Sequence, residues 1–234
     1  MKILIIFIFL FLLSSCGKKA PPIPIEKSIP QQPEITYEPT PFGINIWINL
    51  PEKTEGGYPL NKIKFIEIEK KEEPLRGDSK GKIKKIKLKT KLHSAGRYLL
   101  FTDSELKPAH KYTYRIKLKK DFLVETPYYG EQTLYWTYPP SAVRNITLIL
   151  SSSEELILKW DAPTENIQGG PLIAEPFYSV ERIQNGNLKY FNVKETYFKE
   201  RVSSKERICY RVRPILDYFG TLIPGPYSEK LCYP

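Results

Sequence analysis

The chain has 234 residues, a formal net charge of +10 at pH 7, and 13% aromatic residues. Aromatic and β-branched residues interrupted by frequent Pro and Gly favour an all-β protein over a helical one. The basic balance suits anionic partners such as lipid, lipopolysaccharide or acidic glycan, and the export signal described next argues against nucleic acid.

The N-terminus has the layout of a secretory signal peptide. Met1-Lys2 precede eleven consecutive apolar residues, 3–13, and the small residues Ser14-Ser15 come before Cys16. The apolar run is too short to cross a hydrocarbon core of roughly 30 Å, which needs about 20 residues. We therefore predict a signal peptide over residues 1–15.

Leu13-Ser14-Ser15-Cys16 resembles the lipobox of bacterial lipoproteins. The resemblance implies cleavage before Cys16 and acylation of that cysteine, palmitate included, and two acyl chains anchor a protein stably to a membrane. An ordinary signal peptide with an incidental cysteine is the alternative. Gly17, where Asp would favour the inner membrane, points to the outer membrane, with the protein facing the periplasm or the cell surface.

Residues 16–32 are expected to form a Pro-rich tether. Pro21, Pro22, Pro24 and Pro30 favour an extended conformation. At about 3.1 Å per residue, such a tether would hold the next domain up to roughly 50 Å from the membrane.

Beyond the tether the chain repeats once. Trp47 matches Trp160 at an offset of 113, Ile68 matches Val180 at 112, and Tyr114 matches Tyr210 at 96. The fall in offset indicates an insertion in the first copy, which we place at residues 80–91. Two copies of about 100 residues predict two domains, residues 33–137 and 138–234.

Each copy alternates apolar and polar residues with period two, which predicts strands that pack one face in a core. Leu106-Lys107-Pro108 followed by Tyr112 resembles the loop and tyrosine corner of fibronectin type III domains, whereas Ile208 stands at the corner position of the second copy. Trp47 and Trp160 match that family's core tryptophan. The resemblance implies two tandem immunoglobulin-like (fibronectin type III) antiparallel β-sandwiches.

Cys16 accounts for one of three cysteines. Under the resemblance, Cys209 and Cys232 lie on neighbouring antiparallel strands joined by a loop at residues 217–225, and an exported protein keeps disulfides. We predict a Cys209–Cys232 disulfide, against the alternative of two free thiols.

Residues 80–91 carry seven lysines interleaved with Ile and Leu. One interpretation is a solvated edge strand whose lysines prevent pairing with other chains. The other is a contact with phosphorylated lipid or acidic glycan. The candidate contact residues are the following lysines: Lys82, Lys84, Lys85, Lys87, Lys89 and Lys91.

Three aromatic pairs, Tyr128-Tyr129, Tyr135-Trp136 and Tyr218-Phe219, either stack on sugars or pack between the domains.

Nothing in the sequence predicts catalysis. His93 and His110 are the two histidines, they lack metal-ligand spacing, and no nucleophile elbow or phosphate loop occurs. We expect no metal, no cofactor and no enzymatic activity. The sequence favours a membrane-anchored, non-catalytic binding or scaffolding lipoprotein with an envelope protein as partner; the alternative is a glycan- or lipopolysaccharide-binding accessory.

Overall fold

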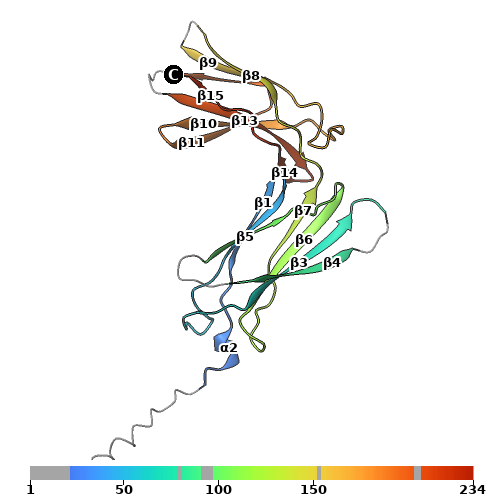
Figure 1. Cartoon of the computed structure of the whole chain (residues 1–234), viewed down its shortest axis with the longest axis vertical. Helices are drawn as coiled ribbons and strands as arrows, with labels where there is room; N and C mark the ends of the chain where they lie inside the picture. The colour runs from blue at the N-terminus through green and yellow to red at the C-terminus, as the bar shows by residue number, and fades with distance from the viewer. Residues whose placement is uncertain (1–21, 78–80, 91–96, 152–153, 203–206, 234) are drawn as a thin grey trace, which may run out of the picture.

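The computed structural model describes residues 22–77, 81–90, 97–151, 154–202 and 207–233. These residues form one short helix and fifteen strands, drawn in Figure 1. In chain order they are α2 (Ile25–Ser28), β1 (Glu34–Thr40), β2 (Gly43–Asn49), β3 (Phe65–Pro74), β4 (Lys82–Lys89), β5 (Tyr98–Asp103), β6 (His110–Lys119), β7 (Tyr129–Trp136), β8 (Arg144–Leu150), β9 (Glu155–Asp161), β10 (Phe177–Gln184), β11 (Asn187–Val193), β12 (Tyr197–Arg201), β13 (Ile208–Tyr218), β14 (Thr221–Pro224) and β15 (Leu231–Tyr233).

The strands form two β-sandwiches of the same design. In the first domain a sheet in the order β1-β2-β5 packs on a sheet in the order β4-β3-β6-β7. In the second, β8, β9 and β12 face a sheet in the order β11-β10-β13-β14, with β15 also paired to β13. Every pairing between these strands is antiparallel, as the resemblance to fibronectin type III domains implied. The chain thus folds as two tandem fibronectin type III-like sandwiches.

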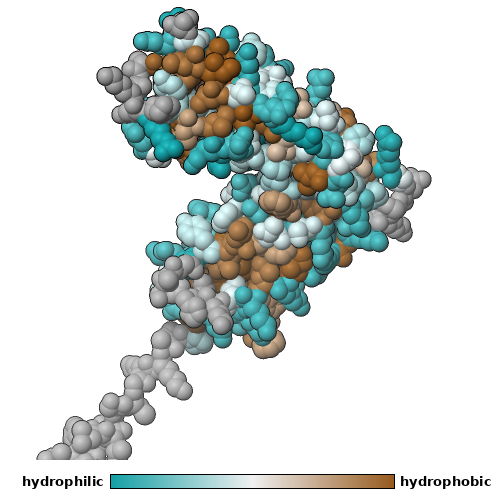
Figure 2. Space-filling model, turned by 45° about the horizontal axis from the view of Figure 1, so that its top comes forward, coloured by the Kyte–Doolittle hydropathy of each residue, from teal (hydrophilic) through white to brown (hydrophobic). Residues whose placement is uncertain are grey.

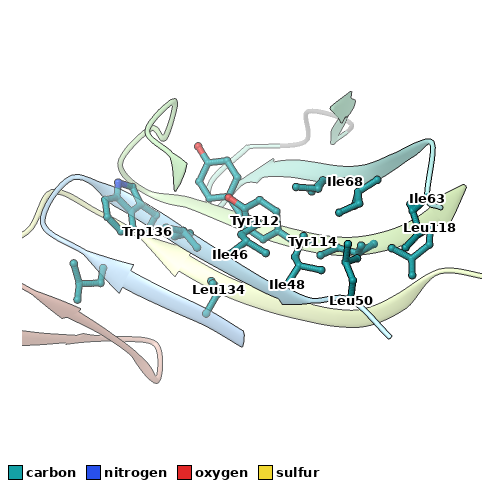
Figure 3. Close-up of a cluster of buried hydrophobic side chains, with 14 of the residues drawn as sticks. Ile46, Ile48, Leu50, Ile63, Ile68, Tyr112, Tyr114, Leu118, Leu134 and Trp136 are labelled. Carbon is teal, nitrogen blue, oxygen red and sulfur yellow. The ribbon is translucent and has the colours of Figure 1, made fainter. Parts of the chain in front are cut away.

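The core of the first domain lies between its two sheets. Ile44, Ile46 and Ile48 of β2 point inward and are fully buried, and Tyr112 and Tyr114 of β6 meet them from the other sheet (Figure 3). The alternation of these side chains along their strands therefore confirms the inward faces expected from the sequence.

The tryptophan match was wrong for the first copy. Trp160 is buried, but Trp47 is 41% exposed and donates a hydrogen bond to Glu38 on the outer face. The buried residues Ile48 and Trp160 are equivalent, at the same offset of 112 that relates Ile68 to Val180. Trp47 alternates with the buried isoleucines of β2 and so faces outward. The alternation along the strand was a better guide to burial than the residue type.

The lysine-rich segment is not an insertion. Its strand β4 pairs with β3 as β11 pairs with β10, so the second domain has a counterpart. The first domain is longer because it has eight residues between β4 and β5, whereas three separate β11 from β12, and because β3 and β4 form a longer hairpin than β10 and β11. The offset between the two copies therefore falls because the connections before and after β4 are longer than those around β11, and not because β4 is an extra strand.

The tyrosine corner forms as the resemblance implied. The Tyr112 hydroxyl accepts a hydrogen bond of 2.7 Å from the backbone N–H of Lys107. Ile208 occupies the equivalent position, where it is fully buried and packs in the second core. The second domain thus replaces a hydrogen bond by apolar burial.

The predicted loop at residues 217–225 is largely a paired hairpin that joins the domains. Leu216 faces Ile223 across β13 and β14, and both belong to the hydrophobic cluster of the first domain with no exposed surface. The Thr221 hydroxyl accepts the backbone N–H of Tyr135 at 2.9 Å. Figures 1 and 3 show this hairpin reaching β1 and β7.

The expected tether is attached to the first domain over its second half. Backbone hydrogen bonds join Gly56 to Lys27, Glu55 to Ile29, and Gln31 to Lys53. The structured part of the chain thus begins before residue 33, and the boundary expected there falls too late. Sequence parity could not show this attachment, since the segment is held by backbone groups of a loop.

Candidate binding surface

The outer face of the first domain's four-stranded sheet is built from rows of opposite charge. Glu67 and Glu69 of β3 form the central acidic row, although both are largely buried. The register places Lys87 and Lys85 of β4 on one side of them and Lys117 and Arg115 of β6 on the other. Long basic side chains therefore cover the carboxylates from both sides.

One cluster on this face is tightly bonded. Arg115 Nε donates to Glu69 Oε1 at 2.7 Å, and the Tyr128 hydroxyl lies 2.8 Å from Glu67 Oε1 and 3.0 Å from Glu69 Oε2. The Tyr128 ring covers the Arg115 guanidinium at 4.2 Å. Burial would raise the pKa of Glu67, but the Tyr128 hydrogen bond and nearby lysines outweigh it and lower that pKa.

The second domain repeats this cluster. Arg211 Nε and Nη2 donate to the two oxygens of Glu181 at 2.6 and 2.9 Å, and the Tyr227 ring covers the guanidinium at 3.9 Å. The glutamate and the arginine of each cluster stand on equivalent strands, and each tyrosine comes from a segment beside the sheet. Because the same three residue types recur in this arrangement, we assign these clusters to the stability of the sheets rather than to ligand binding.

The lysines of β4 divide between two faces. Lys85, Lys87 and Lys89 lie on the outer face, whereas Lys82 and Lys84 alternate with them and lie on the side of Ile86 and Leu88. The predicted set is therefore not one continuous row. Lys91 lies outside the described residues.

Ion pairing reduces the set further. Lys84 is 2.5 Å from Glu105, and Lys85 is 3.6 Å from Glu67. In the described part of the chain, Lys82, Lys87 and Lys89 have no carboxylate at ion-pair distance. The strand itself lies at the edge of its sheet, as one interpretation predicted. That its lysines prevent pairing with other chains stays a prediction. The contact with anionic ligands stays a prediction.

The aromatic pairs take structural positions. Tyr128 covers Arg115, as described above, and the rings of Tyr135 and Phe219 lie 5.3 Å apart at the domain junction. Trp136 is buried in the first core. These contacts support packing over sugar stacking for Tyr135 and Trp136. Phe219 is 69% exposed, so sugar stacking by its ring stays a prediction.

Cys209 and Cys232 are bonded as a disulfide. They are direct partners across β13 and β15, with a sequence separation of 23. The prediction from the sequence is confirmed. β15 pairs with β13 over only three residues. The disulfide therefore adds a covalent link where the backbone pairing of the two strands is short.

The histidines and the acidic residues of the described ranges do not form a metal site. His110 Nδ1 lies 2.8 Å from the Pro108 carbonyl oxygen, and His93 lies outside the described residues. Within the described ranges, no group of three or more His, Cys, Asp or Glu side chains is placed to hold a metal ion. Cys16 also lies outside them. In the same ranges, none of the helices is long and apolar enough to cross a membrane.

The described residues form several surface depressions. One of about 640 Å³ lies in the second domain beside Pro163, Leu172, Ile173 and Tyr178. Another, of about 470 Å³, lies beside Lys71, Glu73, Lys111 and Glu131 on the charged outer face. Its mixed charge suits neither a purely anionic nor a purely cationic ligand.

One pair of exposed apolar residues was not predicted from the sequence. Phe122 and Leu123, in the connection from β6 to β7, are 92% and 80% exposed, the highest values among large hydrophobic side chains in the described ranges. Two adjacent apolar residues directly after a run of lysines were the available signal. Figure 2 shows that hydrophobic residues also reach the surface elsewhere on both domains.

No family model and no curated protein matches the sequence. Among solved structures, the FN1–FN3 domains of chicken CNTN1 are similar to this chain, with 12% sequence identity and a TM-score of 0.41. The similarity covers 88% of this chain and 63% of that one, so this chain spans less than two thirds of that structure. The fold assignment rests on the strand order and register described above.

Proposed function

We propose that this protein is an envelope lipoprotein, anchored through an acylated Cys16, that acts as a non-catalytic binding or scaffolding module. The observation that carries the anchor is the sequence Leu13-Ser14-Ser15-Cys16 after an apolar run of signal-peptide length. The outer membrane is the proposed location because Gly17 follows the cysteine.

The attachment of residues 27–31 to the first domain supports a short spacing from the membrane. Eight residues, 17–24, separate Cys16 from α2. At about 3.1 Å per residue they reach at most roughly 30 Å. The first domain would thus stand closer to the lipid than a free tether of residues 16–32 allows.

The domain junction supports a scaffolding role. Leu216 and Ile223 of the second domain complete the core of the first, and Tyr135 is hydrogen-bonded to the same hairpin. Burying such side chains fixes the orientation of two domains more firmly than a polar contact does. The second domain would then be presented at a defined angle to an envelope protein.

The alternative is binding of acidic glycan or lipopolysaccharide. Lys87 and Lys89 favour it, because they face solvent on the outer face without a carboxylate partner among the described residues. Lys117 and Lys119 of β6 also face outward, but Glu125 pairs with both.

Three experiments test the proposal. In cells, Cys16→Ala should leave the protein soluble or unprocessed and unlabelled by an alkynyl fatty acid; membrane association at the wild-type level with the signal removed would refute the anchor. Site-specific photo-crosslinking followed by mass spectrometry should capture an envelope protein. A glycan array should show no charge-dependent binding; binding lost in Lys87→Glu but kept in Lys189→Glu, on the equivalent strand of the second domain, would favour the alternative.

A further inference from the structure

The loop between β6 and β7 presents two apolar side chains in a fixed conformation. The Asp121 side chain accepts the backbone N–H groups of Leu123 and Val124 at 2.8 and 2.9 Å. Lys120 N–H donates to the Val124 carbonyl, and Val124 itself is buried. Phe122 and Leu123 are thereby held outward at the tip, rather than left there by disorder.

Basic groups surround this tip. Lys64 Nζ lies 3.5 Å from the centroid of the Phe122 ring, and the Lys64 backbone is bonded to that of Lys119. Lys62 and Lys64 are both exposed. Of the two carboxylates in this connection, Asp121 is engaged by the loop backbone and Glu125 is paired with Lys117 and Lys119.

The tip also lies at the end of the domain where the chain enters. Lys120 Nζ donates to the Ser28 carbonyl at 3.3 Å, which joins the loop to the end of α2. Figure 1 shows the β6–β7 connection beside α2. Phe42, by contrast, is at the opposite end, in the turn between β1 and β2, and is 78% exposed.

We propose that Phe122 and Leu123 insert into the interface of the anionic membrane that carries the anchor, with Lys62, Lys64 and Lys120 against its headgroups. Apolar side chains flanked by lysines bind at such an interface, and each lysine near an anionic surface adds attraction. This inference rests on the proposed lipid anchor. The acyl chains hold the protein on the membrane, and the loop sets the orientation in which both domains leave it.

A tethered assay separates this proposal from the anchor. The mature chain, residues 16–234, has Cys16 as its one free thiol, because Cys209 and Cys232 are bridged. Coupling Cys16 to a maleimide lipid bypasses acylation in cells. We would compare Phe122→Trp with the control Phe42→Trp, measuring the added tryptophan emission on vesicles of phosphatidylcholine and phosphatidylglycerol with and without brominated chains.

Brominated lipid should quench the emission added at position 122 and leave that at position 42 unchanged. Omitting phosphatidylglycerol, or Lys62→Glu with Lys64→Glu, should reduce the quenching. In an unanchored chain, Phe122→Ser and Leu123→Ser should each weaken vesicle binding about tenfold or more, with Phe42→Ser unchanged. Equal quenching at both positions, or none at 122, would overturn the proposal even if Cys16 is lipidated. A protein crosslinked at position 122 without quenching would point to a protein partner instead.

Discussion

The hairpin of β13 and β14 offers a decisive test of how the two domains are joined. Ile223 lies in a strand of the second domain, but it has no exposed surface and packs in the core of the first domain. Ile223→Ala removes buried carbon atoms and leaves a cavity, which costs about 2–5 kcal/mol in free energy of unfolding. The cost should fall on the first domain, although the substitution is some 90 residues beyond that domain's last strand.

Leu222→Ala is the matched control. Leu222 is the preceding residue on the same strand but points the other way and is 50% exposed. Its substitution should change the free energy of unfolding by no more than about 0.5 kcal/mol. Both variants keep the turn and the β13–β14 hydrogen bonds.

Hydrogen exchange with mass spectrometry measures where the loss occurs. Because two domains need not unfold in one step, local exchange is a better readout than a single melting curve. Backbone amides of β1 and β7 should exchange faster in Ile223→Ala than in Leu222→Ala. Faster exchange confined to residues 138–233, or equal behaviour of both variants, would refute a shared core.

Three further predictions concern bonds within the domains. Removing the disulfide by Cys209→Ala with Cys232→Ala should lower the free energy of unfolding by about 3 kcal/mol for a loop of this separation, and reductant should cause a similar loss in the wild type; a denaturation curve insensitive to reductant would contradict it. Tyr112→Phe should cost about 1 kcal/mol by denaturant titration through loss of the bond to Lys107, whereas the exposed Tyr98→Phe should be neutral. Burial raises the pKa of Tyr112 to about 12, so its neutral form is favoured in the folded state. Its contribution should be complete below pH 10 and should be lost as the pH rises toward 12. Since a rise of about two pKa units corresponds to about 2.7 kcal/mol, more than the hydrogen bond contributes, the stabilities of wild type and Tyr112→Phe should approach each other and cross within that window.

Parity along the strands was the most reliable guide to the fold. It predicted which side of β2 and β6 faces the core, whereas the strand neighbours needed for the Cys209–Cys232 bond came from the fibronectin type III resemblance. Parity succeeds because a half-buried strand must alternate, whatever the residue types. The tryptophan match was wrong at Trp47, because the residue type was given more weight than the alternation along the strand.

Long-range contacts of backbone and loops could not be predicted in this way. The bonds from Lys27 and Ile29 to the loop at residues 55–56 involve main-chain groups, which every residue carries. The hairpin at residues 217–225 contains Gly and Pro, so its sequence resembles a free loop, yet Leu216 and Ile223 are buried by another domain. Such contacts depend on where domains meet, and local pattern holds no information on that.

The candidate binding lysines illustrate the same limit. Their sequence predicts a charged edge strand, and β4 is one. Which lysines remain available depends on acidic partners far along the chain, such as Glu67 and Glu105. A run of charge in a sequence therefore overstates the charge that a ligand meets, and Lys87 and Lys89 are the residues on which tests of anionic binding should concentrate.

Buried charges trace the internal repeat better than the aromatic residues do. In the first domain Lys70 lies 2.6 Å from Asp103, whose carboxylate accepts the Tyr114 hydroxyl at 2.7 Å. In the second, Arg182, Glu200 and Tyr210 form the same contacts on the equivalent strands: Arg182 Nε lies 2.7 Å from Glu200, to which the Tyr210 hydroxyl is also bonded. Removing one partner of a buried ion pair costs about 3–5 kcal/mol, which applies to Lys70 and Asp103. Arg182 and Glu200 are partly exposed, at 15% and 20% of their side-chain surface, so the cost of losing one of them should be smaller. An exposed tryptophan such as Trp47 is under no such constraint, so the match of Tyr114 with Tyr210 is a better guide to the alignment of the two copies than the match of the tryptophans.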